Sequence, residues 1–248
     1  MGPTWRRSAL SRRYGAVEPG ALRIFFDLET SGVGTPDDTR ARVVSIAAAV
    51  ETSPYARLAA ASCRASVPRG CFSSLVNPFG PQSPYAVKVH GLTDEALAAE
   101  RGFEEVWEAF CGWAHREQAL VPGVHALVLV GHNSNSHDVP KLLSELRRAG
   151  REIFELLAPG SPAALSFEDT YPRRRLEQGS LRSALSSSTL RLSDVYASAI
   201  GTSGPTRPHD ALWDAAALRD AWRASEAIRR HAWRRTADEA LAHWLERG

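Results

Sequence analysis

The sequence predicts an α/β fold in which a mixed central sheet is flanked by helices. Strand patterns come first, near 22–28, 43–50 and 58–76, and helical patterns dominate the rest of the chain. Strands followed by helices in this order are typical of a sheet that is covered by helices. With 248 residues, of which 44% are hydrophobic, the chain can bury one such core without a second domain.

The first strand carries two acids. In the segment IFFDLETSG (24–32), strand alternation places Phe25, Asp27 and Glu29 on one face and three apolar residues on the other. Two carboxylates on one face of an apolar strand cost desolvation and mutual repulsion, and a bound divalent cation removes this cost. Mg²⁺ or Mn²⁺ is the expected ligand.

Apolar spacing and capping residues indicate the elements that follow the first three strands. A helix from Thr236 is indicated by a capping box with Glu239. The other predictions are a helix over 103–114 with an aromatic face, a strand over 125–131, and helices over 139–149, near 193–200 and from about 210.

A third acid, Asp138, follows the strand over 125–131 and precedes a helix. Pro140 suits the first turn of that helix, where a missing amide proton does no harm, and Gly150 suits its C-terminal end. Asp138 is therefore expected at a strand-to-helix junction.

His209 and Asp214 are five residues apart. On one helix they would be separated by about 140°, so they would not share a face. Pro208 favours an extended or turn entry, which places His209 just before the helix and Asp214 on it.

Three motifs now stand in order: Asp27-x-Glu29, His132-Asn133-x4-Asp138 and His209-x4-Asp214. They resemble the motifs of the DEDDh exonucleases of the ribonuclease H-like superfamily, and the long spacing between the first two is most similar to the three-prime repair exonuclease branch. The resemblance spans roughly residues 22–220.

The resemblance implies a ribonuclease H-like fold and a 3′–5′ exonuclease that acts on DNA, with single-stranded 3′ ends preferred, and releases 5′-mononucleotides. Asp27, Glu29, Asp138 and Asp214 would hold two Mg²⁺ ions, or Mn²⁺ in their place, and His209 would take a proton from the attacking water. Two alternatives stay open: an RNA-trimming exonuclease with the same site, and a catalytically silent binding module.

Substrate contacts are also carried over from the family. The segment NPFGPQSPYAVKVHGLTDEAL (77–97) is similar to a loop that touches the terminal nucleotide. Thr93 can instead be an ordinary helix N-cap before two acids. The expected contact residues are Thr30, Ser31, His90, Leu92, Thr93 and Asn133.

Three consecutive arginines, Arg173, Arg174 and Arg175, open a Ser-rich stretch (171–191) that is predicted to be a basic loop. They are expected to pair with substrate phosphates, which would make the affinity salt-dependent. A plain solvated loop is the alternative.

Three residues depart from the family pattern. Gly131 replaces a usual Ala, His137 stands where Phe or Tyr commonly precedes the third acid, and Trp213 directly precedes the last ligand. These departures concern the shape of the pocket, and none removes a ligand.

Composition bounds the remaining properties. A formal net charge of +2 permits a nucleic-acid partner without indicating one, and no apolar run approaches a membrane span. Three cysteines without CxxC spacing and the lack of a signal peptide predict an intracellular protein, cytoplasmic or nuclear.

The expected organisation has three parts: a flexible basic arm over 1–20, the exonuclease domain over 21–225, and a helical extension over 226–248 that packs on it. Some relatives form homodimers through an edge strand, and 58–76 is the segment that would do so here.

Overall fold

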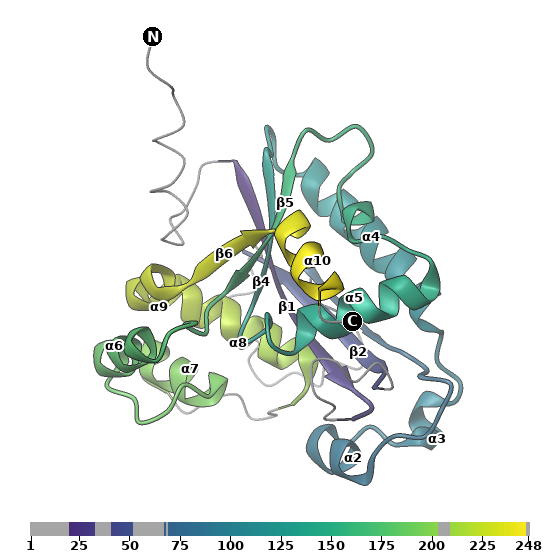
Figure 1. Ribbon diagram of the computed structural model, residues 1–248, viewed down its shortest axis with the longest axis horizontal. Coiled ribbons are helices and arrows are strands. Elements are labelled where there is room, and N and C mark those ends of the chain that lie inside the picture. Colours follow the sequence, from purple (N-terminus) through teal and green to yellow (C-terminus); the bar gives the residue numbers. More distant parts are fainter. Residues whose placement is uncertain (1–19, 33–40, 52–66, 68, 203–208, 247–248) are drawn as a thin grey trace.

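The computed structural model describes residues 20–32, 41–51, 67, 69–202 and 209–246. Within these residues a central sheet has the strand order β3-β2-β1-β4-β5-β6 (Figure 1). Strands β1, β4 and β5 run parallel, whereas β2, β3 and β6 join antiparallel to their neighbours. The strands are β1 (Ala21–Thr30), β2 (Val43–Val50), β3 (Cys71–Leu75), β4 (Ala126–Gly131), β5 (Ala164–Asp169) and β6 (Trp233–Thr236).

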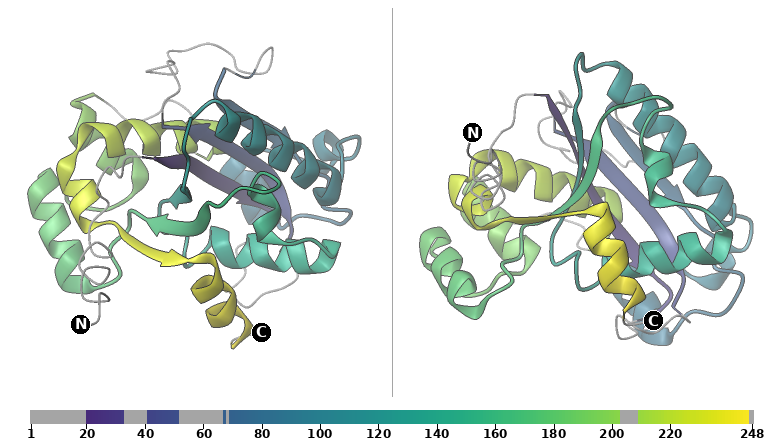
Figure 2. Two further views of the ribbon diagram at one scale, coloured as in Figure 1. Left: turned by 90° about the horizontal axis from the view of Figure 1, so that it is seen from above. Right: turned by 45° about the horizontal axis from the view of Figure 1, so that its top comes forward.

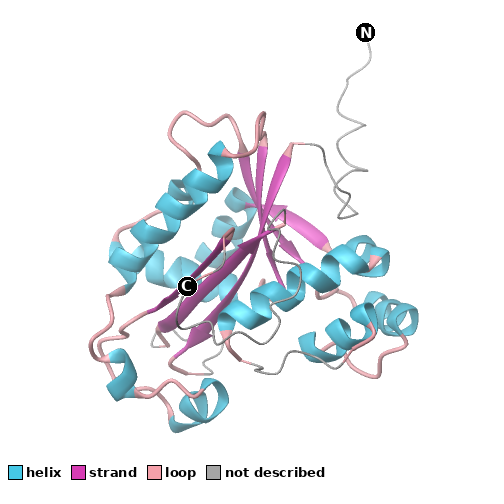
Figure 3. Cartoon of the chain, turned by 180° about the vertical axis from the view of Figure 1, so that it is seen from behind, coloured by secondary structure: helices cyan, strands magenta, loops and turns pink. Residues whose placement is uncertain are grey.

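Helices cover both faces of this sheet, as Figures 2 and 3 show. Helices α4, α5 and α10 lie on one face, and α6 to α9 lie on the other. None of the helices among the described residues has the length and apolar character that crossing a membrane requires. The helices are α2 (Pro84–His90), α3 (Asp94–Leu97), α4 (Phe103–Ala119), α5 (Asp138–Ala149), the 3₁₀ turn η2 (Ile153–Leu156), α6 (Arg175–Leu185), α7 (Leu192–Ile200), α8 (Ala211–Ala224), α9 (Glu226–His231) and α10 (Ala237–Leu245). The mixed sheet flanked by helices confirms the predicted fold class.

Strand β1 lies at the centre and has the predicted alternation. Ile24 and Phe26 belong to the apolar core under α4 and α5, while Phe25 packs in the core on the opposite face. Helix α8 lies across β1 and β2 on the face of Phe25. Asp27 and Glu29 share that face by alternation, so they are directed toward the side of the sheet that α8 covers.

The C-terminal segment contributes a strand that the sequence analysis did not predict. Strand β6 pairs with β5, so the segment over 226–248 is not purely helical. Glu168, which is fully buried on β5, anchors this addition: it accepts hydrogen bonds from Trp222 Nε1 at 3.0 Å and from Arg234 Nη2 at 2.9 Å. The predicted helix from Thr236 is confirmed, with both hydrogen bonds of its capping box.

The predicted basic loop over 171–191 is wrong in its middle part, where α6 forms. Leu181 and Leu185 are four residues apart and bury one side of this helix, and two such residues are a weak periodic signal in a Ser-rich stretch. Arg173 and Arg174 precede the helix, and Arg175 is its first residue.

Two further predictions fall partly on residues that the structure does not describe. The arm over 1–20 lies outside them except for Gly20, and so does most of 58–70. The described end of that segment forms β3, at the edge of the sheet beside β2. A homodimer through this edge remains a prediction.

Gly131 ends β4 where a side chain has no room. A Cβ atom at this position would lie 2.3 Å from Cβ of Ser134, which is fully buried. The Ser134 carbonyl accepts the amide protons of His137 and Val139, and these bonds fix the turn that leads into Asp138. The departure from the family's Ala therefore follows from the neighbouring Ser134 side chain.

We expect Gly131→Ala to lower the free energy of unfolding by about 1–3 kcal/mol, because an overpacked buried turn must shift. Denaturant unfolding followed by circular dichroism measures this loss. Adding Ser134→Gly removes the clashing atoms, so the double variant should recover part of the stability despite the extra glycine. A double variant in which the two losses simply add would contradict this account.

Candidate active site

The two acids of β1 lie at its C-terminal end, above the centre of the sheet. Asp27 and Glu29 stand opposite Ala47 and Ser45 of β2, and Ala47 packs against Ala211 and Leu212 at the start of α8. The β1–β2 register shifts between Glu29 and Thr30, so the strand pairing changes directly after the second acid. Glu29 is 9% exposed, so its carboxylate sits in a largely dry environment.

Asp138 reaches the same place from the start of α5. Its Oδ1 atom accepts the backbone amide of Leu28 at 3.1 Å, a residue that lies between the two acids of β1. The predicted strand-to-helix junction is thus confirmed, and Gly150 ends α5 in the left-handed conformation at φ 65°. This hydrogen bond ties the third acid to the first two.

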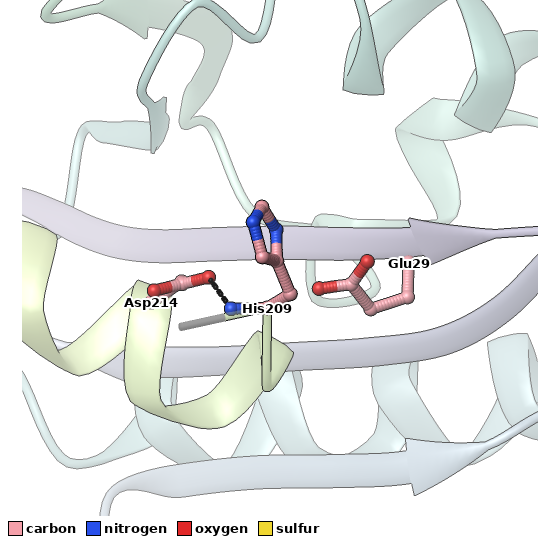
Figure 4. Close-up of side chains that lie close together, drawn as sticks. All are labelled: Glu29, His209 and Asp214. Carbon is pink, nitrogen blue, oxygen red and sulfur yellow. Dashed lines mark hydrogen bonds between the residues drawn. The ribbon is translucent and has the colours of Figure 1, made fainter. Parts of the chain in front are cut away.

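His209 and Asp214 come from the N-terminal end of α8. As predicted, His209 precedes the helix, which begins at Ala211. Its backbone has φ 65°, a conformation that non-glycine residues rarely adopt, and its amide donates to Asp214 Oδ2 at 2.9 Å. One carboxylate oxygen of Asp214 therefore holds the histidine in place (Figure 4).

One ligand atom each from Glu29, His209 and Asp214 lie within 4.8 Å of one another. Figure 4 shows these side chains from β1 and the start of α8 converging on one position. Asp27 and Asp138 are not part of this group of three, but both are close enough for their charges to act on one another. The structure thus brings all five predicted active-site residues to one region.

The electrostatics of the cluster are unfavourable without a counter-ion. Burial, followed by repulsion from neighbouring acids, raises the pKa of Glu29 to about 9 and that of Asp27 well above its usual range. Burial also raises the pKa of Asp138 to about 7 and that of Asp214 to about 6. Carboxyls that resist ionisation in this way are stabilised as carboxylates by bound cations.

The donor set fits divalent cations. Carboxylate oxygens are the ligands that Mg²⁺ and Mn²⁺ prefer in proteins. Four mutually repelling acids with raised pKa values are difficult to explain as a purely structural feature. We therefore take Asp27, Glu29, Asp138 and Asp214 as the residues that fit the metals.

A further acid, Asp210, belongs to the same region and was not predicted. Its side chain caps α8 by accepting the amides of Leu212 and Trp213, at 3.2 and 3.4 Å. Its charge contributes to the raised pKa values of Asp27 and Glu29. Its position directly after His209 is the signal that sequence reasoning could have used.

Asp169, at the end of β5, is a second residue that the sequence analysis missed. It is 2% exposed and accepts three backbone amides, from Asn133 at 2.8 Å, Asn135 at 3.0 Å and Tyr171 at 2.9 Å. Burial raises its pKa to about 6, and these hydrogen bonds oppose the rise. The carboxylate of Asp169 thus shapes the segment over 131–138, whose last residue is Asp138.

Asn133 and His132 have structural contacts in this segment. Asn133 adopts φ 59°, a left-handed conformation that Asn tolerates better than most residues. His132 lies between Thr170 Oγ1 at 2.8 Å and the carbonyl of Leu190 at 2.7 Å, so it links this segment to the chain before α7. Contact of Asn133 with substrate stays a prediction.

The residues after the acid pair also have partners within the chain. Thr30 Oγ1 donates to the carbonyl of Gly32 at 2.9 Å, and Ser31 Oγ accepts the amide of Arg42 at 2.8 Å. Ser31 is only 7% exposed. These bonds hold the turn next to Glu29, and substrate contact by Thr30 and Ser31 remains a prediction.

The second loop reaches the site through His90. Burial lowers the pKa of His90, and the charge of His209 lowers it further, which places the two imidazoles near each other. Its Nδ1 accepts the amide of Leu92 at 3.1 Å. Thr93 is the N-cap of α3, because its hydroxyl accepts the amide of Ala96, and this agrees with the alternative role given to it above.

The remaining departures from the family pattern lie at the rim. His137 is exposed and directly precedes α5, and Trp213 is half-buried in the first turn of α8. The three arginines Arg173, Arg174 and Arg175 are all exposed beside the segment that Asp169 organises.

Comparison with known proteins agrees with this geometry. Residues 24–220 match the RNase_T family, which is described as an exonuclease. A search of curated proteins found no significant match.

Solved structures with the same fold include three nucleases. The nuclease domain of 3′hExo, a DEDDh family member bound to rAMP, has a TM-score of 0.53 and 14% identity over 84% of this chain and 91% of its own. A 3′-exonuclease that recognises the histone mRNA stem-loop has a TM-score of 0.55 and 13% identity over 81% and 79%. The zinc-bound Escherichia coli ExoI complex with single-stranded DNA has a TM-score of 0.51 and 17% identity over 82% of this chain.

The present chain spans 40% of the length of ExoI, so the similarity concerns the nuclease fold and not the whole of that protein. The family match covers β1, β4, α5 and most of α8, which are the elements that carry the five motif residues. The chain therefore belongs to the RNase_T exonuclease family and has the ribonuclease H-like fold that the order of its motifs predicts.

Proposed function

We propose that this exonuclease removes nucleotides one at a time from the 3′ end of single-stranded DNA, by a two-metal mechanism that releases 5′-mononucleotides. The observation that carries the proposal is the convergence of Glu29, His209 and Asp214 within 4.8 Å, with Asp27 and Asp138 beside them. This is the residue set that the three motifs specify.

Divalent cations held by the four acids would supply positive charge for the scissile phosphate and for the leaving 3′ oxygen. The chain itself supplies the proton acceptor. His209 stands before α8 with its backbone fixed by Asp214, so its imidazole can accept a proton from the attacking water. Imidazole exchanges protons near neutral pH, which suits this role better than another carboxylate would.

The preference for single-stranded DNA is supported by one similar structure, ExoI, which is bound to single-stranded DNA. The similar 3′-exonuclease that recognises a histone mRNA stem-loop supports the alternative substrate, RNA. The two substrates differ at the 2′-hydroxyl, and Thr30, directly after Glu29, and His90, whose pKa is influenced by Thr30 and His209, are polar residues that a ribose could contact.

The first prediction tests the activity and its metal dependence. With 5′-labelled single-stranded DNA, duplex DNA and RNA of one sequence, a Mg²⁺-dependent ladder should shorten from the 3′ end and disappear in EDTA. His209→Ala and Asp214→Ala should each lower the rate by about 10²-fold or more, because each removes a group that acts on the reacting phosphate or water.

Thermal melts of both variants serve as the control for folding. The relative rates on the three substrates decide between DNA and RNA. If wild-type protein with Mg²⁺ leaves all three substrates intact, the proposal fails and the binding-module alternative stands.

The second prediction concerns pH and metal. Because the folded-state pKa values of Glu29, Asp138 and Asp214 are raised to about 9, 7 and 6, the folded protein binds more protons than the unfolded chain between about pH 4 and pH 9. In EDTA the melting temperature should therefore fall as pH rises through this range. Mg²⁺ should reverse the fall, with a larger stabilisation at pH 8 than at pH 5.

Asp214→Asn provides the matched control for this prediction. It removes one charge from the cluster and keeps an oxygen that can accept the amide of His209. At pH 8 in EDTA it should melt higher than wild type, and it should gain less from Mg²⁺. A melting temperature in EDTA that rises steadily from pH 5 to pH 8 in the wild type would contradict the proposed electrostatics.

The third prediction concerns the exposed arginines. Replacing Arg173, Arg174 and Arg175 with alanine should raise KM for DNA severalfold with little change in kcat, since these side chains would contact phosphates away from the cleaved bond. The plot of log affinity against log salt concentration should become shallower by about 1–2 in slope. An unchanged slope would show that the arginines form only a solvated surface.

A further inference from the structure

A cavity of about 520 Å³ lies beside the proposed active site and is lined by both aromatic and basic residues. Its walls come from α5 and the segment before it, from the chain just before α6, and from the C-terminal elements β6 and α10. Asn135, Ser136, Arg173, Trp233 and Trp244 are among the lining residues. This volume is typical of pockets that hold small organic ligands.

The cavity and the active site share one short segment of chain. Asn135 and Ser136 line the cavity, and Asp138 lies only two residues further on, at most roughly 7 Å along the backbone. The carboxylate of Asp169 accepts a hydrogen bond from the backbone amide of Asn135. Asp169 also stands opposite Trp233 in the pairing of β5 with β6. The chain segment that leads into Asp138 therefore also forms one wall of the cavity.

The aromatic walls are held in fixed positions. Trp233 Nε1 donates to the carbonyl of Tyr171 at 3.1 Å, and the guanidinium of Arg173 lies 5.7 Å from the centre of the Trp233 ring. The guanidinium of Arg147, on α5, lies 5.6 Å from the centre of the ring of Trp244, which is on α10. Rings that are anchored in this way offer flat apolar surfaces at little entropic cost.

The charged residues of the cavity are mostly basic. Arg173, Arg235 and His243 line it together with one acid, Glu239. Arg234 also lines it, but its guanidinium pairs with the buried Glu168. Aromatic rings for stacking and arginines for phosphates are the combination that single-stranded nucleic acids require. A purely apolar partner would not match this charge, and an acidic peptide would leave the aromatic walls without a matching group.

Part of the cavity wall lies outside the family match. The family match ends at residue 220, whereas Trp233, Arg235 and Trp244 lie beyond it. The C-terminal strand extends the sheet next to β5 and so builds the outer wall.

We propose that this cavity binds a nucleotide of the substrate strand next to the one that is cleaved, with its base against the tryptophans and its phosphate near Arg173. The inference rests on the proposed exonuclease function and deepens it. The cavity would then set how the rate depends on substrate length.

The experiment measures kcat/KM for the p-nitrophenyl ester of thymidine 5′-monophosphate, which has no neighbouring nucleotide, and for single-stranded oligonucleotides from a dinucleotide to a decanucleotide. The proteins are wild type, Arg173→Glu and Trp244→Leu. Arg223→Glu, which replaces an exposed arginine at the far end of α8, is the charge-matched control. Wild type and the control should gain kcat/KM from the ester to the oligonucleotides. Each cavity variant should lose about tenfold of that gain, the scale of one lost stacking or phosphate contact, from the dinucleotide onward, and should match wild type on the ester.

Binding measured without turnover separates the two proposals. Fluorescence anisotropy of a labelled decanucleotide is measured in Mg²⁺ on ice, with the cavity substitutions placed in wild-type protein and in His209→Ala. In both backgrounds they should weaken binding by the same factor of about ten. Absence of cleavage together with this weakening would defeat the exonuclease proposal and keep the cavity as a nucleic-acid site.

Three results would overturn the cavity proposal. One is an identical length dependence in the cavity variants and wild type. Another is an equal loss in Arg223→Glu, which would indicate a general effect of charge. The third is binding of free 5′-AMP that is lost in Trp244→Leu while oligonucleotide cleavage is unchanged, which would assign the cavity to a free nucleotide instead of the substrate strand.

Discussion

The mutual repulsion of the acids is the constraint on which this structure depends. Asp27, Glu29, Asp138 and Asp214 come from three elements and are largely removed from water, which disfavours their ionisation. Backbone amides hold two of them in place, from Leu28 to Asp138 and from His209 to Asp214. The sheet core on both faces supplies the rigidity that keeps these carboxylates together, so the unfavourable electrostatics are offset by packing elsewhere in the domain.

Asp169, at the end of β5, fixes the segment that leads to one of these acids. Its buried carboxylate accepts the amides of Asn133 and Asn135 in the β4–α5 connection, and the turn so formed needs Gly131 because Ser134 occupies the adjacent space. The position of Asp138 is therefore determined by a residue that does not itself belong to the motif. The β4–α5 connection can thus hold the Asp138 carboxylate in one position, which a residue that could hold a metal in a defined geometry requires.

The sequence was sufficient for the parts of the fold with strong local signals. The alternation in β1 placed Asp27 and Glu29 correctly on one face, and the proline before His209 placed that residue ahead of α8. Strand β6 was not predicted because Trp233–Thr236 is short, polar and paired on one side only. Its stability comes from pairing with β5 and from the ion pair between Arg234 and Glu168. Asp169 was not predicted because its role depends on hydrogen bonds from backbone amides that are distant in the sequence, such as that of Asn133.

The acid cluster and the basic residues of the cavity would link metal binding to substrate binding in the proposed enzyme. A nucleic acid brings phosphates toward a cluster of acids, which would repel them as long as the acids are ionised without counter-ions. Cations at Asp27 and Glu29 would remove that repulsion, while Arg173 and the basic residues near β6 would attract the strand. Under the proposed function each ligand would then favour the other, and by thermodynamic reciprocity the substrate would raise the affinity for metal by the same factor. Without bound cations the ionised acids would disfavour a bound strand.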